Sequence, residues 1–314
     1  MIDAIGQGLV EFNEDKALEY YIDWMQTDNE LHFINEETGE DLRVQAPKRG
    51  NQTYARRKYR SMKKVVDGMD KLDFDFQAVG RPGLFRHTHL LLITLTFDPS
   101  KVSKERAWYL CSTRGGALNL FRANLTNKLG SKASITVKEA QESGYPAPHI
   151  LIMLDRPVRA IRHVGRKDHT ISWRLQDPEV LRDVKEKWSH GFMDVEAVVR
   201  RGSKFKGYSS PVMYLAKYLV KGMNVEKYPE LRTAKSMKDV HGKKLRIALN
   251  THFWNKLFRM RDIYISKAFK ERLNMIREAK KPPTSWTLSE ITYPVSREPS
   301  PEPFNGPPVA LAVS

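Results

Sequence analysis

The sequence predicts a mixed α+β fold, and three observations predict it. Residues 90–97 are an unbroken apolar run of the kind that forms a buried strand. Residues 133–141 and 149–154 carry strand patterns on either side of a turn rich in glycine and proline, which favours an antiparallel hairpin. Residues 103–129 and 211–221 show helical spacing of apolar side chains. Hairpin strands combined with separate helices are typical of the α+β class.

Composition limits the classes of protein that this chain fits. Its 314 residues are enough for one large domain or two small ones. The single cysteine, Cys111, excludes an internal disulfide and a four-cysteine zinc site, and it favours a reducing compartment. No apolar stretch approaches the ~20 residues of a membrane span, and no signal peptide is visible. We therefore expect a soluble, cytoplasmic protein with no membrane partner.

Charge is distributed unevenly along the chain. The formal net charge is +16 and the isoelectric point is near 9.7. Residues 1–42 contain twelve acidic residues and one lysine, a net charge of −11, so the remainder carries +27. A basic body of this size predicts a polyanionic partner, and nucleic acid is the polyanion that we expect.

We expect the chain to begin with an extension, residues 1–80, that is first acidic and then basic. Weak helical periodicity appears around residues 17–24. Residues 43–64 are rich in lysine and arginine, with Tyr54 and Tyr59 interleaved. This pattern predicts a helix that lies on DNA phosphates, and a solvated helix face is the alternative interpretation.

The central region, residues 81–225, contains elements in the order β-α-β-β-α-β-α. Its first helix, over residues 103–129, is interrupted at Gly115 and Gly116. The segments after the hairpin are a basic irregular insertion at 156–174, a helix at 178–188, a strand at 193–199 and a helix at 211–221. This order predicts a ferredoxin-like (RRM-like) antiparallel unit with one helix appended.

Two further segments complete the chain. Residues 226–280 are expected to form a basic helical region, with the helical pattern clearest over residues 244–280. Residues 281–314 hold eight of the seventeen prolines and show little periodicity. That composition predicts a disordered tail.

The last helix of the central region has a chemically unusual face. The polar residues at positions i, i+3, i+4 and i+7 are Tyr214, Lys217, Tyr218 and Lys221. This spacing places all four on one side of a helix. A phenol oxygen can attack phosphorus and hold the phosphate as a covalent ester, and a lysine one turn away can neutralise the phosphate's charge. An amphipathic helix that only exposes its polar tips has the same spacing, so both interpretations fit this face.

Three segments in combination resemble a known family. They are the strand LLITLTFD at 91–98, the segment EAQESGYPAPHILI at 139–152 and the helix segment YLAKYLVK at 214–221. Their order and spacing resemble the HUH endonucleases, the rolling-circle replication initiators of plasmids and small viruses. The motifs of that family are a TLTF-type strand, a PHxH strand and a YxxKYxxK helix. The resemblance covers roughly residues 85–222, and it implies an HUH endonuclease domain.

The second segment departs from the family pattern at one position, because Leu151 stands where the second histidine is expected and leucine cannot bind a metal. His149 is the remaining histidine of the motif. If the hairpin turns at its glycine, Glu139 lies directly opposite His149 and within reach of a shared ion. The resemblance implies a carboxylate ligand from this neighbourhood and a divalent metal, Mg²⁺ or Mn²⁺. Glu142 and His89 are weaker candidates for a further ligand.

The resemblance also implies a mechanism. Tyr218 is expected to be the first nucleophile and Tyr214 the nucleophile of the second cleavage, with Lys217 and Lys221 holding the phosphate. The implied substrate is single-stranded or origin DNA. The implied product is a 5′-phosphotyrosine and a 3′-hydroxyl that primes synthesis. The helicase and polymerase of a prokaryotic host would be further partners.

Three alternatives remain open from the residues alone. A two-tyrosine transposase shares the motif order. A DNA-binding initiator that has lost cleavage is favoured by Leu151. An RNA-binding ferredoxin-like domain would need aromatic residues on its central strands, where this sequence has mostly aliphatic ones.

Overall fold

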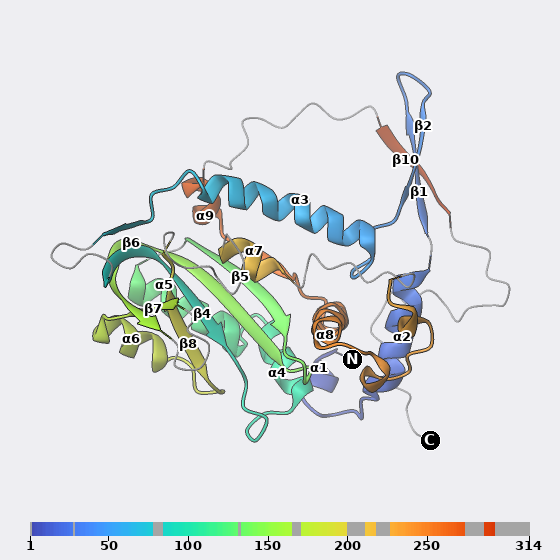
Figure 1. Cartoon of the computed structure of the whole chain (residues 1–314). Helices are drawn as coiled ribbons and strands as arrows, with labels where there is room; N and C mark the ends of the chain where they lie inside the picture. Colours follow the sequence, from blue (N-terminus) through green and yellow to red (C-terminus); the bar gives the residue numbers. More distant parts are fainter. Residues whose placement is uncertain are drawn as a thin grey trace.

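The computed structural model of the chain has a mixed α+β fold with antiparallel sheets and several helices (Figure 1). The residues that it describes are 2–27, 29–77, 84–130, 133–164, 171–199, 211–217, 227–273 and 286–292. Every strand pairing among these residues is antiparallel. No helix among them is both long enough and apolar enough to cross a bilayer.

A seven-stranded sheet forms the body of the molecule in the described residues. Its strands are β3 (Asp75–Gln77), β4 (Phe85–Leu95), β5 (Ala133–Ala140), β6 (Pro146–Val164), β7 (Ile171–Leu175), β8 (Met193–Ala197) and β9 (Ile263–Ile265). They are ordered β3-β4-β8-β7-β6-β5-β9, and β4 also pairs directly with β6. The length of β6 allows this arrangement, because its first half pairs with β5 and its second half with β7.

Helices cover both faces of this sheet (Figure 1). The α-helices are α1 (Ile2–Gly6), α2 (Glu14–Gln26), α3 (Gln52–Met69), α4 (Lys104–Ser112), α5 (Ala117–Leu129), α6 (Pro178–Lys185), α7 (Pro211–Ala216), α8 (Lys243–Leu257) and α9 (Lys267–Arg272). Short 3₁₀ turns occupy Pro229–Arg232 and Met237–Asp239.

The interruption predicted within residues 103–129 is confirmed, because α4 and α5 meet there. The side chain of Ser103 accepts a hydrogen bond from the backbone N–H of Arg106 and caps α4. Gly116 caps α5. A Cβ atom at Gly116 would lie 2.2 Å from the carbonyl oxygen of Leu110, so only glycine allows the two helices to approach this closely.

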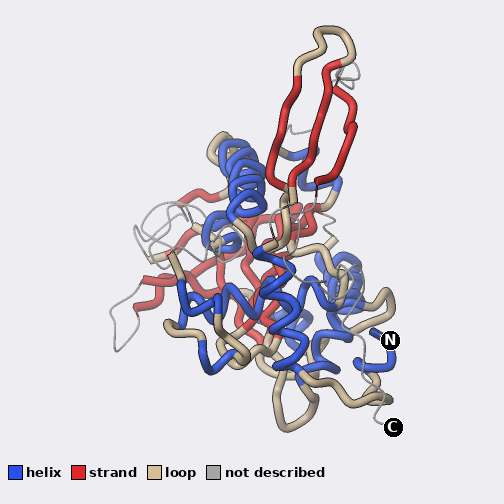
Figure 2. The backbone as a smooth tube through the Cα atoms, turned by 90° about the vertical axis from the view of Figure 1, so that its right-hand side faces the viewer, coloured by secondary structure: helices blue, strands red, loops and turns tan. Residues whose placement is uncertain are grey.

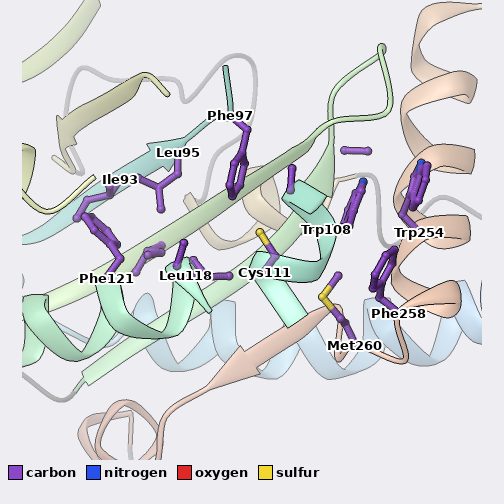
Figure 3. Packing of buried hydrophobic residues seen from close by; sticks show 14 of the residues in the cluster. Ile93, Leu95, Phe97, Trp108, Cys111, Leu118, Phe121, Trp254, Phe258 and Met260 are labelled. Carbon is purple, nitrogen blue, oxygen red and sulfur yellow. The ribbon is translucent and has the colours of Figure 1, made fainter. Parts of the chain in front are cut away.

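The first core lies between one face of the sheet and helices α2, α4, α5 and α8. Strand alternation on β4 directs Leu91, Ile93 and Leu95 to this face. Figure 3 shows Ile93 and Leu95 together with aromatic residues of the covering helices. Trp108 of α4 stacks on Trp254 of α8 with ring centroids 6.0 Å apart. Large interlocking rings of this kind contribute strongly to stability.

The second core lies on the opposite face of the same sheet. The alternate residues of β4, Leu90 and Leu92, point to it, and Leu151 of β6 joins them. Helices α3, α7 and α9 cover this face, and Val65 and Leu215 are among the side chains that they bury. In Figure 1, α3 passes above α7, and the two helices are in contact.

A separate three-stranded sheet, which we call the arm, projects from the body (Figure 2). It consists of β1 (Glu30–Asn35) between β2 (Asp41–Gln45) and β10 (Trp286–Thr292). The expectation that residues 281–314 are disordered is wrong for β10. Residues 286–289 alternate in polarity, and β1 supplies the backbone partners that an isolated strand lacks.

Two other expectations about secondary structure need correction. Residues 156–164 and 171–174 are not an irregular insertion, because β6 continues to Val164 and pairs with β7, and the residues between them lie outside the described ranges. The alternating burial of Val158 and Ala160 marks this stretch as a strand, although its many basic side chains obscure the pattern. Residues 244–280 are not wholly helical, because the short strand β9 separates α8 from α9.

Candidate active site

Four of the six residues predicted for the site are described, and they lie together on the second-core face of the sheet. His149 is on β6 and Glu139 is on β5. Tyr214 is on α7, and Lys217 follows directly after it. The two remaining residues, Tyr218 and Lys221, lie outside the residues that the structure describes.

The hairpin register differs from the expected one. His149 lies opposite Val137, and Glu139 lies opposite Ala147, so Glu139 and His149 are not directly paired. The turn is centred one residue earlier than expected, where the backbone N–H of Gly144 donates to the carbonyl of Gln141. Register in a hairpin depends on turn geometry, which the residue types alone did not reveal.

The two side chains nevertheless meet. Glu139 and His149 sit diagonally across the hairpin on the same face, an arrangement that long side chains can bridge. The Nε2 atom of His149 lies 3.4 Å from an oxygen of the Glu139 carboxylate. Only 3% of the Glu139 side chain is exposed to solvent. A carboxylate buried to this degree requires a compensating partner.

Thr94 is a site residue that the sequence did not single out. It lies directly opposite His149 on β4, and its hydroxyl is 3.0 Å from the Nδ1 atom of His149. Strand alternation from Leu90 and Leu92 places Thr94 on the second-core face. That alternation within the LLITLTFD strand was the available signal. Thr94 holds the imidazole so that its other nitrogen points toward Glu139.

Helix α7 brings the third segment to the same place. The ring of Tyr214 packs edge-on against the imidazole of His149, with ring centroids 6.3 Å apart. The ammonium of Lys217 lies 3.7 Å from the centroid of the Tyr214 ring, which is a cation–π contact. Val212 and Leu215, both buried in the second core, anchor the helix over the sheet. Tyr214 on α7 and Lys217 just after the end of α7 are therefore in contact, as their i, i+3 spacing predicted.

Leu151 has a clear structural role. It points to the same face as His149 and is fully buried in the second core. Its neighbours across the sheet are Leu92 on β4 and Ile135 on β5. An apolar contact therefore occupies the place of the second histidine.

The donor atoms present fit a divalent cation at one position. In the described part of the chain, the Oε1 atom of Glu139 is buried and accepts no hydrogen bond. When Nδ1 of His149 donates to Thr94, Nε2 presents a lone pair to the carboxylate, and a cation would relieve the repulsion. Two ligands of one ion, each about 2.1 Å from it, are roughly 3.0–3.4 Å apart, which the observed 3.4 Å matches.

The other candidate ligands lie elsewhere. The described residues contain no group of three or more His, Cys, Asp or Glu side chains that could hold a metal. His89 is five residues from Thr94 along β4, roughly 16 Å away, and its Nδ1 atom is 3.0 Å from the carbonyl oxygen of Leu154. Glu142 forms ion pairs with Arg246 and Lys243. Neither side chain joins His149 and Glu139.

Next to the site, α3 carries a strongly basic outer face. Its exposed cations are Arg56, Arg57, Arg60, Lys63 and Lys64. These cations lie on a helix that is in contact with the tyrosine helix α7. A row of exposed cations beside a candidate phosphate site is suited to a nucleic-acid backbone.

A buried carboxylate fixes the start of α3 against the edge of the sheet. Asp262, just before β9, is fully buried and forms ion pairs with Arg49 and Lys58. Burial raises the pKa of Asp262 from 3.8 to about 6, although Arg49 acts in the opposite direction. Burial also lowers the pKa of Lys58, and the nearby Arg49 and Arg57 lower it further. This cluster ties the basic helix to the sheet that carries the site.

Comparisons of the chain with protein-family models, with curated proteins and with solved structures found no match. The functional argument therefore depends on the geometry of the site.

Proposed function

We propose that this protein is a metal-dependent DNA endonuclease and strand transferase of the HUH type, which initiates rolling-circle replication. One observation carries the proposal. Thr94, His149 and Tyr214 come from the three segments whose order resembles the family, and all three lie in one contact cluster with Glu139. If the three short segments resembled the family motifs only by chance, there would be no reason for their side chains to meet in the fold.

The strand arrangement supports the same proposal. In a ferredoxin-like β-α-β-β-α-β unit, the first and third strands form the central pair. Here the corresponding strands are β4 and β6, which pair along most of their length. The second strand, β5, flanks β6, and the fourth, β8, flanks β4. Helix α7 corresponds to the appended helix that carries the nucleophile.

The chemistry assigned to α7 is a transesterification. The phenol oxygen of a tyrosine attacks the scissile phosphorus, an O–P bond to tyrosine forms, and the bond to the 3′ oxygen breaks. The phenol loses its proton, and the departing 3′ oxygen gains one. Lys217 neutralises charge on the phosphate. We assign the first attack to Tyr218 and the second to Tyr214, one helical turn before it.

His149 and Glu139 are the residues that would hold Mg²⁺ or Mn²⁺. When bound, such an ion polarises the phosphate and stabilises the charge that develops on it. Thr94 orients the imidazole through Nδ1. The exposed cations of α3 would bind the backbone of single-stranded or origin DNA, with affinity falling steeply as salt rises. Host helicase and polymerase would act on the strand opened in this way.

A second candidate function is a DNA-binding initiator that no longer cleaves. The observation that favours it is Leu151, which fills the place of a metal ligand with core packing. This protein would bind origin DNA through its basic surface and recruit replication proteins without forming a covalent bond. A two-tyrosine transposase of the same fold would share the site and differ in its DNA substrate.

The deciding experiment is a covalent-adduct assay. Wild-type protein is incubated with Mn²⁺ and end-labelled single strands that cover its own replicon, and the products are resolved on denaturing gels. The variants are Tyr214→Phe, Tyr218→Phe, the double variant and His149→Ala. Tyr20→Phe is the matched control, because Tyr20 is exposed on α2, which covers the opposite face of the sheet.

We expect an adduct that survives denaturation in wild type and in Tyr20→Phe, and that is lost in the double tyrosine variant and in His149→Ala. Each single tyrosine variant should retain part of it. Salt-sensitive DNA binding without any adduct under Mg²⁺ or Mn²⁺ would instead support the non-cleaving initiator. An adduct that persists in the double variant would exclude both tyrosines.

A further inference from the structure

One face of the arm carries a cluster of six apolar side chains, with Asn35 at its end near the tip. The register pairs Leu31 of β1 with Val44 of β2 and with Ile291 of β10. It pairs Phe33 with Leu42 and Leu288 in the same way. Because side chains opposite one another share a face, these six residues form a single surface, which we call the apolar face of the arm.

The opposite face of the arm is polar. Its residues include Glu30, His32 and Arg43, with Glu290 opposite His32 on β10. Ile34 is the apolar exception on this side, and it is 39% exposed. In β1 and β2 the contrast follows a two-residue alternation, and in β10 a bulge at Ser289 brings Leu288 and Ile291 to the same face, which is the pattern of a sheet with one covered side.

The apolar face belongs to neither core of the molecule. None of its six residues is among those that form or pack against the first or second core. Leu42 is 45% exposed and Leu288 is 46% exposed. A three-stranded sheet needs its apolar face packed against something to be stable, and a continuous exposed apolar surface marks an interaction site.

Charge along the arm shows what kind of partner fits. The turn at its tip, between β1 and β2, and the strand residue after it are acidic, with Glu36, Glu37, Glu40 and Asp41. At its base β2 leads into α3, whose first turns expose Arg56 and Arg57. Tip and base therefore carry opposite charge. An acidic tip also repels DNA, so nucleic acid is not the partner that this surface fits.

We propose that a second copy of this chain covers the apolar face of the arm. The two arms pack face to face in a two-fold arrangement and run antiparallel. The acidic tip of each arm then reaches the basic base of the other, beside the start of α3. Two sheets packed in this way bury both apolar faces at once. The contact is self-complementary, as a two-fold interface requires. This assembly is independent of the proposed chemistry.

The antiparallel orientation follows from charge. In a parallel arrangement the two acidic tips would lie together and repel each other, and the bases would do the same. In the antiparallel arrangement, Glu37 and Glu40 face cations of the partner. The pairing also places two basic α3 helices on one particle.

The first test is sedimentation of the full-length protein over a wide range of concentrations. We expect wild type to shift from monomer to dimer as concentration rises. Leu42→Asp puts a carboxylate into the buried interface of both copies and should weaken dimerisation by more than ~100-fold. The matched control is Ile34→Asp, which carries the same change on the opposite face of the arm, and it should dimerise like wild type.

The second test fixes the orientation. A chain with Glu37→Cys and Arg57→Cys should form an intermolecular disulfide under mild oxidation, whereas a chain with only Glu37→Cys should not. The native Cys111 does not interfere, because burial raises the pKa of its thiol to about 12. Cross-linking by Glu37→Cys alone would overturn the antiparallel arrangement.

Two outcomes would overturn the proposal as a whole. One is a wild-type protein that stays monomeric at every concentration while Leu42→Asp lowers its melting temperature, because the face is then covered within one chain. The other is a dimer that Leu42→Asp and Ile34→Asp affect equally. DNA cleavage activity plays no part in either measurement, so these results do not depend on the proposed function.

Discussion

Buried polar side chains make different contacts on the two faces of the central sheet. On the first-core face, polar side chains of α8 satisfy backbone groups of β5. Thr251 accepts a hydrogen bond from the backbone of Ala140, and Asn255 donates one to the carbonyl of Lys138. On the second-core face, His149 and Glu139 contact each other, and one oxygen of Glu139 accepts no hydrogen bond in the described residues.

This difference distinguishes buried polar groups that stabilise the fold from buried polar groups that can bind a ligand or react. Thr251 and Asn255 bond to backbone groups of β5 and so hold α8 against the sheet, although the Oδ1 atom of Asn255 is itself buried without a hydrogen bond in the described residues. A buried carboxylate with an unused oxygen destabilises the fold, and such positions are typical of sites that bind or react. The comparison therefore predicts that substitutions on the first-core face act mainly on folding. Those on the second-core face act mainly on function.

The largest effect is expected from Trp108→Ala on the first-core face. Trp108 stacks on Trp254, and its ring N–H donates to the carbonyl of Gly144 at 2.8 Å. Truncation leaves a cavity and an unsatisfied carbonyl and should lower the free energy of unfolding by about 3–5 kcal/mol. Urea unfolding followed by circular dichroism measures it. The control is Leu120→Ala on the exposed surface of α5, which should change the free energy of unfolding by less than about 0.5 kcal/mol. Equal losses would contradict the assignment.

The next effect concerns Asp262, at the edge where the two faces meet. Its pKa is higher in the folded protein, about 6, than the ordinary 3.8. The folded state therefore binds this proton more tightly, and stability should fall as pH rises from about 4 to about 6. A shift of about two units corresponds to roughly 3 kcal/mol. The free energy of unfolding, measured across this pH range, should decline less steeply in Asp262→Asn than in wild type.

The matched control for that slope is Asp239→Asn. Backbone N–H groups of Lys235 and Ser236 lower the pKa of Asp239, so its contribution has the opposite sign and is lost as pH falls. The two variants should therefore change the pH dependence in opposite directions. If Asp262→Asn leaves the slope between about pH 4 and 6 unchanged, its burial does not control this titration.

A smaller effect of opposite sign is expected at Glu139 on the second-core face. Glu139→Leu removes a buried carboxylate with an unused oxygen, so it should raise the free energy of unfolding by about 1–2 kcal/mol while abolishing cleavage. Thermal unfolding and the adduct assay measure the two consequences. Glu142→Leu is the control, because Glu142 is only partly buried and is ion-paired with Arg246. Stability that falls in Glu139→Leu would contradict the comparison.

The smallest effect is expected at Thr94. Thr94→Val keeps the shape of the side chain and removes its hydrogen bond to His149, which should lower the free energy of unfolding by about 0.5–1.5 kcal/mol. Adduct formation should fall more than stability does, because the imidazole loses its orientation. Thr94→Ser keeps the hydroxyl and should restore activity. A valine variant with full activity would show that Thr94 only packs.

Local pattern alone predicted much of the fold. Hydrophobic periodicity and the positions of glycines are signals that act over a few residues. They predicted the strand at residues 90–97, the split helix over residues 103–129 and the tyrosine helix. Helical spacing also selected Tyr214 as a candidate, whereas His149 was selected by the resemblance of its segment to a family motif. Chemistry-bearing residue types at helical or strand spacing can be recognised before any long-range contact is known.

The tertiary structure alone decided which residues meet. The hairpin register moved Glu139 away from direct pairing with His149 and kept the two in contact diagonally, and neighbouring β4 brought Thr94 to the imidazole. The pairing of β10 with β1 gave the arm a strand from a segment that composition had marked as disordered. Sequence pattern determines what one segment prefers. Register and long-range pairing depend on turn geometry and on partners elsewhere in the chain, which no local pattern contains.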